Sequence, residues 1–138
     1  MVITIKKTDF ENIVAYAKSK LPEEACGLIG GSHGEEEDHI EKIYYLTNID
    51  HTNEHFSMDP KEQLAAVKDM RANHLVPLGN WHSHPETPSR PSEEDIRLAY
   101  DEKAYYLILS LMDEEHPVLN AFHVHSGKVS REELKILS

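Results

Sequence analysis

The sequence contains very little cysteine, few basic residues and no long apolar run. Its single cysteine, Cys26, cannot form a disulfide within the chain, so we expect neither a disulfide framework nor an oxidising compartment. The longest largely apolar stretch, Tyr105 to Met112, is far shorter than the roughly 20 residues of a membrane-spanning helix. The first residues place their lysines after the apolar positions and lack the apolar region of a signal peptide. Together these absences favour a cytoplasmic protein.

Basic residues are scarce relative to acidic ones. Lys and Arg total 14 against 25 Asp and Glu, which gives a formal net charge of −11 in 138 residues. An acidic chain without a basic stripe binds nucleic acid and anionic membranes poorly, so we expect neither partner. The length is that of one ordinary domain, which we expect to span residues 1–138. The residue present in excess is histidine, with ten copies.

Helical and strand patterns interleave along the chain. Alternation and short apolar runs predict strands at 2–5, 25–31, 39–49, 76–84, 104–112 and 118–125. Helical spacing and capping signals predict helices that start with capping boxes at Thr8 and Asp59, and a third that starts after Ser92. The tail, 128–138, fits either a capped helix or an edge strand. Without a strict βαβ rhythm, these elements predict an α+β fold with a mixed or largely antiparallel sheet.

Two of the histidines form a pattern that suggests chemistry. His82 and His84 lie two residues apart at the end of a predicted strand, so their side chains share one face with Cα atoms about 6.7 Å apart. Asp95 stands in the first turn of the next predicted helix, after a loop stiffened by prolines that can return its carboxylate to the pair. Two His and one Asp leave the fourth tetrahedral position open for water, as a catalytic zinc site requires.

Each part of this pattern also has an ordinary structural explanation. A His-x-His on a strand is usually two surface histidines, and Ser92-x-x-Asp95 alone is usually a capping box. Their overlap across a short, rigid loop favours metal binding. A second pair, His123 and His125, has no carboxylate at useful spacing, so we expect it to form the solvated face of a strand.

A hydrolytic metal site also needs a proton acceptor. Glu23 and Glu24 both precede a predicted buried strand, and the residues alone leave open which of them serves, or whether both are merely solvated. Cys26 lies among small apolar residues, which suit an inert buried thiol better than the nucleophile of a Cys-His protease. Trp81 and Ser83 alternate away from the histidines, so we expect them to have structural roles.

In chain order, these residues resemble a known family. The pattern resembles the JAMM motif of MPN-domain zinc metallopeptidases, and it is most similar to the small stand-alone prokaryotic members. The resemblance covers nearly the whole chain, and it implies a cytidine-deaminase-like mixed sheet that is partly curled and flanked by helices. The residues that carry it are Glu24, Cys26-Gly27, His82-Ser83-His84-Pro85 and, six residues later, Ser92-x-x-Asp95.

The resemblance also implies roles for these residues. His82, His84 and Asp95 would bind Zn²⁺. The second glutamate of the pair, Glu24, would be the general acid/base that activates water and protonates the leaving amine. Ser92 would donate a hydrogen bond to the oxyanion. Small prokaryotic relatives are associated with ubiquitin-like sulfur-carrier proteins, so the implied activity is that of a zinc peptidase or isopeptidase cleaving an amide bond after the C-terminal Gly-Gly of such a carrier.

Two other functions remain as alternatives. One is a non-catalytic MPN scaffold, although scaffolds of that kind usually lack the ligands; the other is a metallohydrolase of small amide metabolites. The charge raises a further question, because many ubiquitin-like carriers are acidic and two acidic proteins repel each other at long range. The basic residues that can form a local docking patch are Arg90 in the site loop and Lys61, Lys68 and Arg71 on the second predicted helix.

Overall fold

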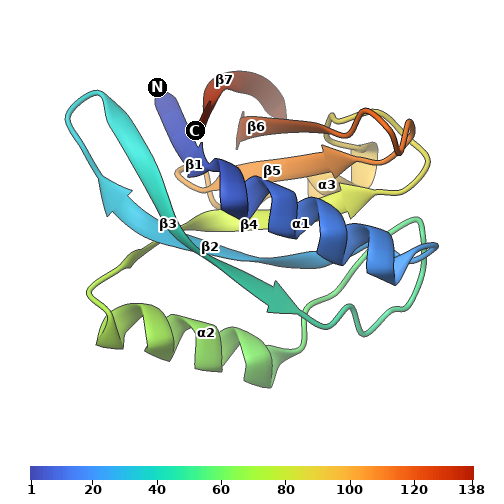
Figure 1. Cartoon of the computed structure of the whole chain (residues 1–138), viewed down its shortest axis with the longest axis horizontal. Coiled ribbons are helices and arrows are strands. Elements are labelled where there is room, and N and C mark those ends of the chain that lie inside the picture. Colours follow the sequence, from blue (N-terminus) through green and yellow to red (C-terminus); the bar gives the residue numbers. More distant parts are fainter.

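Seven strands of mixed direction form a sheet that closes into a barrel in the computed structural model, which describes residues 1–138. The sheet order is β1-β3-β2-β4-β5-β6-β7, and β7 returns to pair in parallel with β1. The predicted α+β fold with a mixed sheet is confirmed, and the sheet curls to full closure. The elements (Figure 1) are β1 (Val2–Lys6), α1 (Lys7–Lys20), β2 (Cys26–His33), β3 (Glu37–Leu46), α2 (Pro60–Ala72), β4 (Val76–His84), α3 (Glu93–Arg97), β5 (Tyr105–Ser110), β6 (Val118–His125) and β7 (Lys128–Leu137).

The strands agree closely with the sequence patterns, except at the β2–β3 hairpin, at the ends of β3 and β5, which stop earlier than predicted, and in the tail. The bounds of β4 and β6 are those predicted, whereas the β2–β3 hairpin is tighter than expected because β2 continues to His33 and β3 begins at Glu37. The tail forms a strand and not a helix. It is not an edge strand, because β7 pairs with β6 on one side and with β1 on the other.

The predicted capping box at Thr8 is wrong. Strand β1 runs directly into α1, so the N-cap is Lys6, which makes no side-chain capping bond, and Thr8 already lies inside the first turn. At α2 only one half of the predicted capping box forms. Asp59 caps the helix by accepting a hydrogen bond from the Lys61 amide. Glu62, however, turns away from the cap and accepts from the backbone and hydroxyl of Thr47, which ties α2 to the end of β3.

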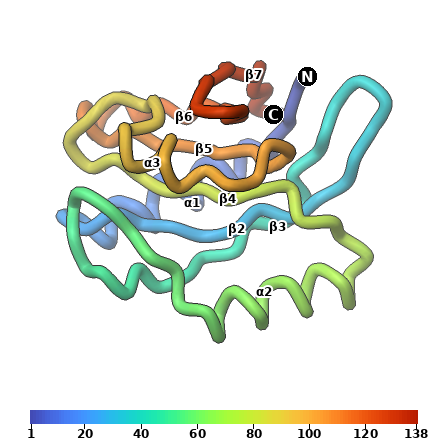
Figure 2. The backbone as a smooth tube through the Cα atoms, turned by 180° about the vertical axis from the view of Figure 1, so that it is seen from behind, coloured from blue at the N-terminus to red at the C-terminus, as the bar shows by residue number.

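Two apolar clusters hold the helices to the sheet. The larger cluster combines strand residues with Ile13 and Ala17 of α1. The smaller one consists of Tyr44, Leu46, Ala66 and Met70, and it fixes α2 over β2 and β3. Seen from either side, α2 lies on the opposite side of the molecule from β7 (Figures 1 and 2). None of the helices is long and apolar enough to cross a membrane.

An irregularity in β4 sets the direction of the residues that follow it. Pairing with β2 skips Leu78, so that residue forms a bulge, and Leu78 and Trp81 both reach the larger cluster although they are three residues apart. Gly79 adopts a φ of 156°, and a Cβ there would lie 2.0 Å from the Tyr105 carbonyl oxygen. Beyond the bulge, regular alternation places Trp81 in the core and turns His82 and His84 to the other face, as predicted.

Candidate metal centre

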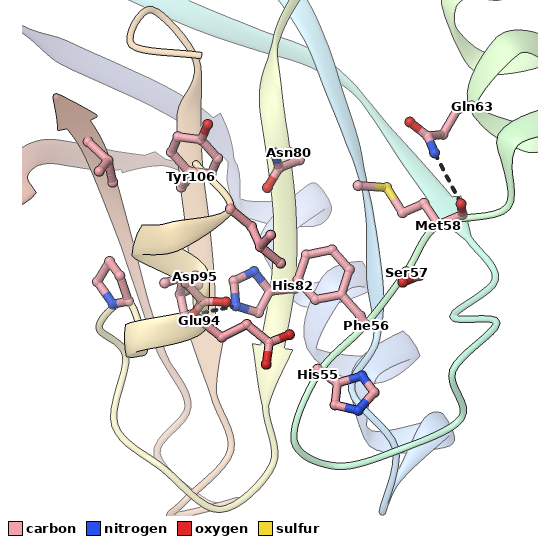
Figure 3. A pocket seen from close by; sticks show the side chains of 14 residues that line it. His55, Phe56, Ser57, Met58, Gln63, Asn80, His82, Glu94, Asp95 and Tyr106 are labelled. Carbon is pink, nitrogen blue, oxygen red and sulfur yellow. Dashed lines mark hydrogen bonds and ion pairs between the residues drawn. The ribbon is translucent and has the colours of Figure 1, made fainter. Parts of the chain in front are cut away.

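Three potential ligand atoms meet where β4 ends and α3 begins. The His82 Nε2 atom lies 3.1 Å from His84 Nε2 and 3.2 Å from Asp95 Oδ2, and the His84 and Asp95 atoms are 3.1 Å apart. Donors held tetrahedrally at about 2.0–2.1 Å from one ion stand roughly 3.3 Å from each other. The triangle therefore has the size that a metal ion requires, and these three residues form a group that can hold one. Figure 3 shows His82 and Asp95 side by side.

The hydrogen bonds around the triangle favour a cation at its centre. The Pro88 carbonyl oxygen, 3.0 Å from His84 Nδ1, can only accept, so this nitrogen carries a proton, and in the neutral form of the ring the lone pair is at Nε2. That lone pair faces the carboxylate of Asp95. The other ring nitrogen of His82 is buried without a hydrogen-bond partner. Acceptor atoms turned toward one another fit a divalent metal ion, which offsets their mutual repulsion.

The capping box of α3 positions the carboxylate of this group. Asp95 Oδ2 accepts a hydrogen bond from the Ser92 amide at 2.9 Å, and Ser92 Oγ accepts one from the Asp95 amide at 3.0 Å. The predicted cap and the predicted ligand are therefore the same residue, and one role does not exclude the other. The Ser92 hydroxyl uses only a lone pair in the cap, so its proton remains available to another acceptor.

Burial and close contact shift the pKa values of the three residues in different directions. Burial lowers the pKa of His82. Burial also acts to lower the pKa of His84, but hydrogen bonds to Asp95 and Pro88 outweigh it and raise that pKa. Burial acts to raise the pKa of Asp95, but its hydrogen bonds with the two histidines lower it well below its usual range. The carboxylate is thus held ionised next to the two rings.

Glu24 reaches the same region from the residues before β2. Its side chain is buried, and its Oε1 atom has no hydrogen-bond partner. Its backbone is fixed on both sides, because its amide donates to Thr52 O at 2.7 Å and its carbonyl accepts from the Asn48 side chain at 3.0 Å. Burial raises the pKa of Glu24 to about 8; His84 lowers it and Asp95 raises it. A buried carboxyl group with a raised pKa is typical of a general acid/base.

The other candidate glutamate has different surroundings. Glu23 Oε1 lies 2.7 Å from the His51 ring nitrogen, and the Glu23 side chain is 35% exposed. The structure therefore separates two residues that the sequence pattern left equivalent.

Neighbouring residues fix the relative positions of Glu24 and the histidines. Ser83 Oγ accepts a hydrogen bond from the Ala25 amide at 2.8 Å, and the Ser83 amide donates to Ala25 O at 2.9 Å. This joins the residue after Glu24 to the residue between the two histidines, so the structural role predicted for Ser83 is confirmed. Gly27 allows a second close approach: a Cβ there would collide with Tyr44 O and the Trp81 indole.

A cavity of about 350 Å³ opens next to His82, as Figure 3 shows. The Phe56 ring stacks on the His82 ring with 4.6 Å between centroids. The sequence reasoning assigned no role to Phe56, nor to Asn48, whose buried amide binds the carbonyl oxygens of Glu24 and His55. Only the position of Phe56 just before the capped helix hinted at its importance, and nothing in the sequence marked Asn48. The cavity walls comprise His55, Phe56, Ser57, Met58, Gln63, Asn80, His82, Pro91, Glu94, Asp95, Leu98, Tyr106, Ile108 and Val124.

The remaining predicted candidates lie outside this group. His123 and His125 turn to separate carboxylates, Glu132 at 3.1 Å and Glu102 at 2.8 Å. That this pair makes no metal site stays a prediction, and His123, which is only 21% exposed, is not fully solvated as expected. Cys26 is buried, and burial raises the pKa of its thiol to about 12, as expected for an inert thiol.

Comparison with known families places the chain in a class that has this fold and motif. The model of the prokaryotic homologues of the JAB domain matches residues 6–125. The chain belongs to that family. The crystal structure of a JAB1/MPN domain protein from Archaeoglobus fulgidus has the same fold, with a TM-score of 0.58 and 24% identity over 98% of this chain and 99% of that one.

Two relatives match over nearly the full length. The CysO-cysteine peptidase of Mycobacterium tuberculosis is 29% identical over 136 residues, which cover 99% of this chain and 92% of the relative. The solution structure of a protein from Desulfitobacterium hafniense is 48% identical, with a TM-score of 0.89, and the match covers 99% of this chain and 92% of that one.

Proposed function

We propose that the protein is a zinc-dependent JAMM-type hydrolase that cleaves an amide bond after the C-terminal Gly-Gly of a ubiquitin-like sulfur-carrier protein. The observation that carries the proposal is the buried, unpartnered carboxyl group of Glu24, which lies close enough to His84 and Asp95 for both to shift its pKa. The similarity to a CysO-cysteine peptidase over nearly the whole chain supports both the chemistry and the kind of substrate.

His82, His84 and Asp95 would hold the zinc ion, because their ligand atoms converge with the spacing that Zn²⁺ requires. When bound, the ion supplies a Lewis acid for the scissile carbonyl and lowers the pKa of water. Glu24 would take a proton from the attacking water and deliver it to the nitrogen of the leaving amine. The Ser92 hydroxyl, whose proton is not used in the cap, would donate a hydrogen bond to the negative charge that develops on the carbonyl oxygen.

The chain's own residues also support a position for the substrate. The cavity beside His82 has apolar walls from Phe56, Met58 and Leu98 and can take the residues that flank the scissile bond. We place the reaction in the cytoplasm, since the chain needs no disulfide and its one cysteine is buried.

The test uses the zinc-loaded protein and the organism's own Gly-Gly carriers, each extended by one or more residues. Mass spectrometry identifies the cut. We expect cleavage directly after Gly-Gly, its loss on chelation and its return when zinc is added back. Glu24→Gln should keep stoichiometric zinc and lose at least about 100-fold in kcat, whereas Glu23→Gln, the matched control, should retain activity.

The outcomes separate the proposal from its alternatives. Stoichiometric zinc without cleavage of any carrier would indicate a scaffold. Equal cleavage of the carrier fusion and of an unrelated small amide would indicate a metabolite hydrolase. Full activity in Glu24→Gln would show that the assigned acid/base is wrong.

A further inference from the structure

Helix α2 carries a row of basic and apolar residues on its outer face, which we name the α2 stripe: Lys61, Leu64, Val67, Lys68 and Arg71. At 100° per residue these positions fall within about one-third of the helix circumference. Leu64 is 56% exposed and Val67 is 36% exposed, and the three basic residues are exposed as well. None of the three cationic side chains forms an ion pair within the protein, although the net charge is −11.

The acidic residues of α2 do not neutralise the stripe, because they are used elsewhere. The Glu62 carboxylate accepts hydrogen bonds from the backbone and hydroxyl of Thr47. The Asp69 carboxylate binds Lys42 at 2.7 Å and the Tyr44 hydroxyl at 2.6 Å. Both acidic residues therefore face the sheet, and the outer face keeps three positive charges around two aliphatic side chains.

The stripe borders the face of α2 that reaches the candidate site. Gln63 lines the cavity beside His82 and lies one helical turn before Val67 of the stripe, and Figure 3 shows the Gln63 side chain between α2 and that cavity. Met70 on the same helix lines a second hollow, which shares Asn80 and Tyr106 with the first. Helix α2 thus contributes one lining residue to each of two hollows that share Asn80, so a molecule whose tail occupied the first hollow could bring its folded body close to the helix.

We propose that the α2 stripe docks the folded body of the ubiquitin-like carrier, through a carrier face that presents carboxylates around an apolar centre. This inference rests on the proposed function and adds a second contact to it, at a distance from the scissile bond. A protein partner fits better than a polyanion, because three cations on a chain of net charge −11 are too few to hold nucleic acid or an anionic membrane. Complementary charges at the rim of such an interface chiefly increase the association rate.

The test compares two triple charge reversals in the full-length, zinc-loaded protein. One is Lys61→Glu/Lys68→Glu/Arg71→Glu in the stripe. The control, Lys7→Glu/Lys128→Glu/Arg131→Glu, reverses exposed residues of α1 and β7. Each reversal changes the net charge by −6, from −11 to −17, so only the location differs. A third variant, Leu64→Ala, removes an exposed aliphatic group without changing the charge.

Two substrates share the same scissile bond: a carrier extended past its Gly-Gly, and a short peptide with the last residues of that carrier. We expect the stripe reversal to raise KM for the carrier about tenfold at low salt with kcat unchanged. It should leave cleavage of the peptide unaltered. The control should leave the peptide unaltered and raise the carrier KM much less than the stripe reversal does, since it adds only the long-range repulsion that both variants share. Leu64→Ala should raise only the carrier KM, by a few-fold.

Binding of the zinc-free protein to a carrier that ends at Gly-Gly gives a readout independent of catalysis. We expect about tenfold weaker binding for the stripe reversal at low salt and a salt dependence of opposite sign to that of the wild type, because salt then screens a repulsion between carboxylates. Equal carrier binding by the wild type and the stripe reversal overturns the inference. A stripe reversal that abolishes the binding of the protein to anionic vesicles but leaves its carrier binding intact also overturns the inference. If the wild type binds the carrier through the stripe but cleaves neither substrate, the proposed activity fails and the docking surface stands.

Discussion

Two strands of the barrel end in the same His-x-His pattern but build different surroundings. On β4, His82 and His84 are buried, and both rings contact one carboxylate oxygen of Asp95. On β6, His123 and His125 turn to two different glutamates, and the His125 side chain is 69% exposed. The difference shows that spacing along a strand does not make a metal site. The three potential ligand atoms converge on β4 because the loop after the strand returns one carboxylate, Asp95, to both rings, and no carboxylate is shared on β6.

The largest effect should come from removing one histidine of each pair. His84→Ala takes away one of three converging ligand atoms, so zinc affinity should fall by more than about 100-fold and carrier cleavage should be lost. His125→Ala removes a ring that touches only Glu102 and should change neither quantity. Competition titration against a zinc chelator measures the affinities. Equal loss of zinc in both variants would contradict the comparison.

Zinc should also stabilise the fold, and only through the first pair. A ligand present at 100 times its Kd adds about 2.7 kcal/mol to the free energy of unfolding, which corresponds to a rise of roughly 10 °C in Tm for a chain of this size. The wild type and His123→Ala should both show this rise in calorimetry. His82→Ala should show none, and a full response in that variant would place the metal elsewhere.

The aromatic neighbours of the two pairs sharpen the contrast. Phe56 stacks on His82 with 4.6 Å between ring centroids, whereas the Tyr105 ring packs at a tilt against His123 with 4.3 Å between centroids. Tyr105→Phe removes a hydroxyl that donates to the buried Asp38 at 2.6 Å, so it should cost about 2 kcal/mol of stability while zinc binding stays unchanged. Phe56→Leu should instead weaken zinc binding a few-fold and change the denaturant midpoint of unfolding only slightly.

The smallest expected effect is a dependence of the folding stability on pH that arises from Asp38, near the second histidine pair. Burial acts to raise the pKa of Asp38, but hydrogen bonds from Tyr105 and His33 outweigh it and lower that pKa. The ionised group therefore stabilises the fold above its unfolded pKa of about 3.9, and this contribution is lost as the pH falls through the folded value. The stability difference between the wild type and Asp38→Asn should narrow below about pH 4. A difference that stays constant down to pH 2 would rule out this linkage.

The parts of the fold that could be read from the sequence are those governed by local periodicity. The bounds of β4 and β6 are the predicted ones, although a bulge at Leu78 interrupts the alternation of β4. The tail could not be assigned, because its identity as β7 depends on β1 and β6, which are far away in the sequence. The cap at Thr8 failed for a related reason: the chain enters α1 directly from a strand that tertiary pairing extends to Lys6.

The candidate site likewise has residues that the sequence could predict and residues that only the fold identifies. His82, His84 and Asp95 lie within 14 residues of sequence, so strand alternation and a short loop were enough to bring them together. The choice between Glu23 and Glu24 required the fold, because burial, the Asn48 side chain and the His51 ring distinguish them only in three dimensions. The same holds for Phe56, which stacks on His82 from a loop 26 residues earlier.

Closure of the sheet limits how an extended tail can be recognised. Every strand of the barrel has two neighbours, so no strand offers a complete free edge. Only partial edges remain, such as β3 beyond His39, where its pairing with β1 ends, so a tail that adds itself as a strand finds few main-chain partners along the sheet. We therefore expect recognition to depend mainly on side chains and loop backbone around the cavity. Selectivity among carriers should then depend on the residues next to Gly-Gly, and it should change when the walls of that cavity are altered.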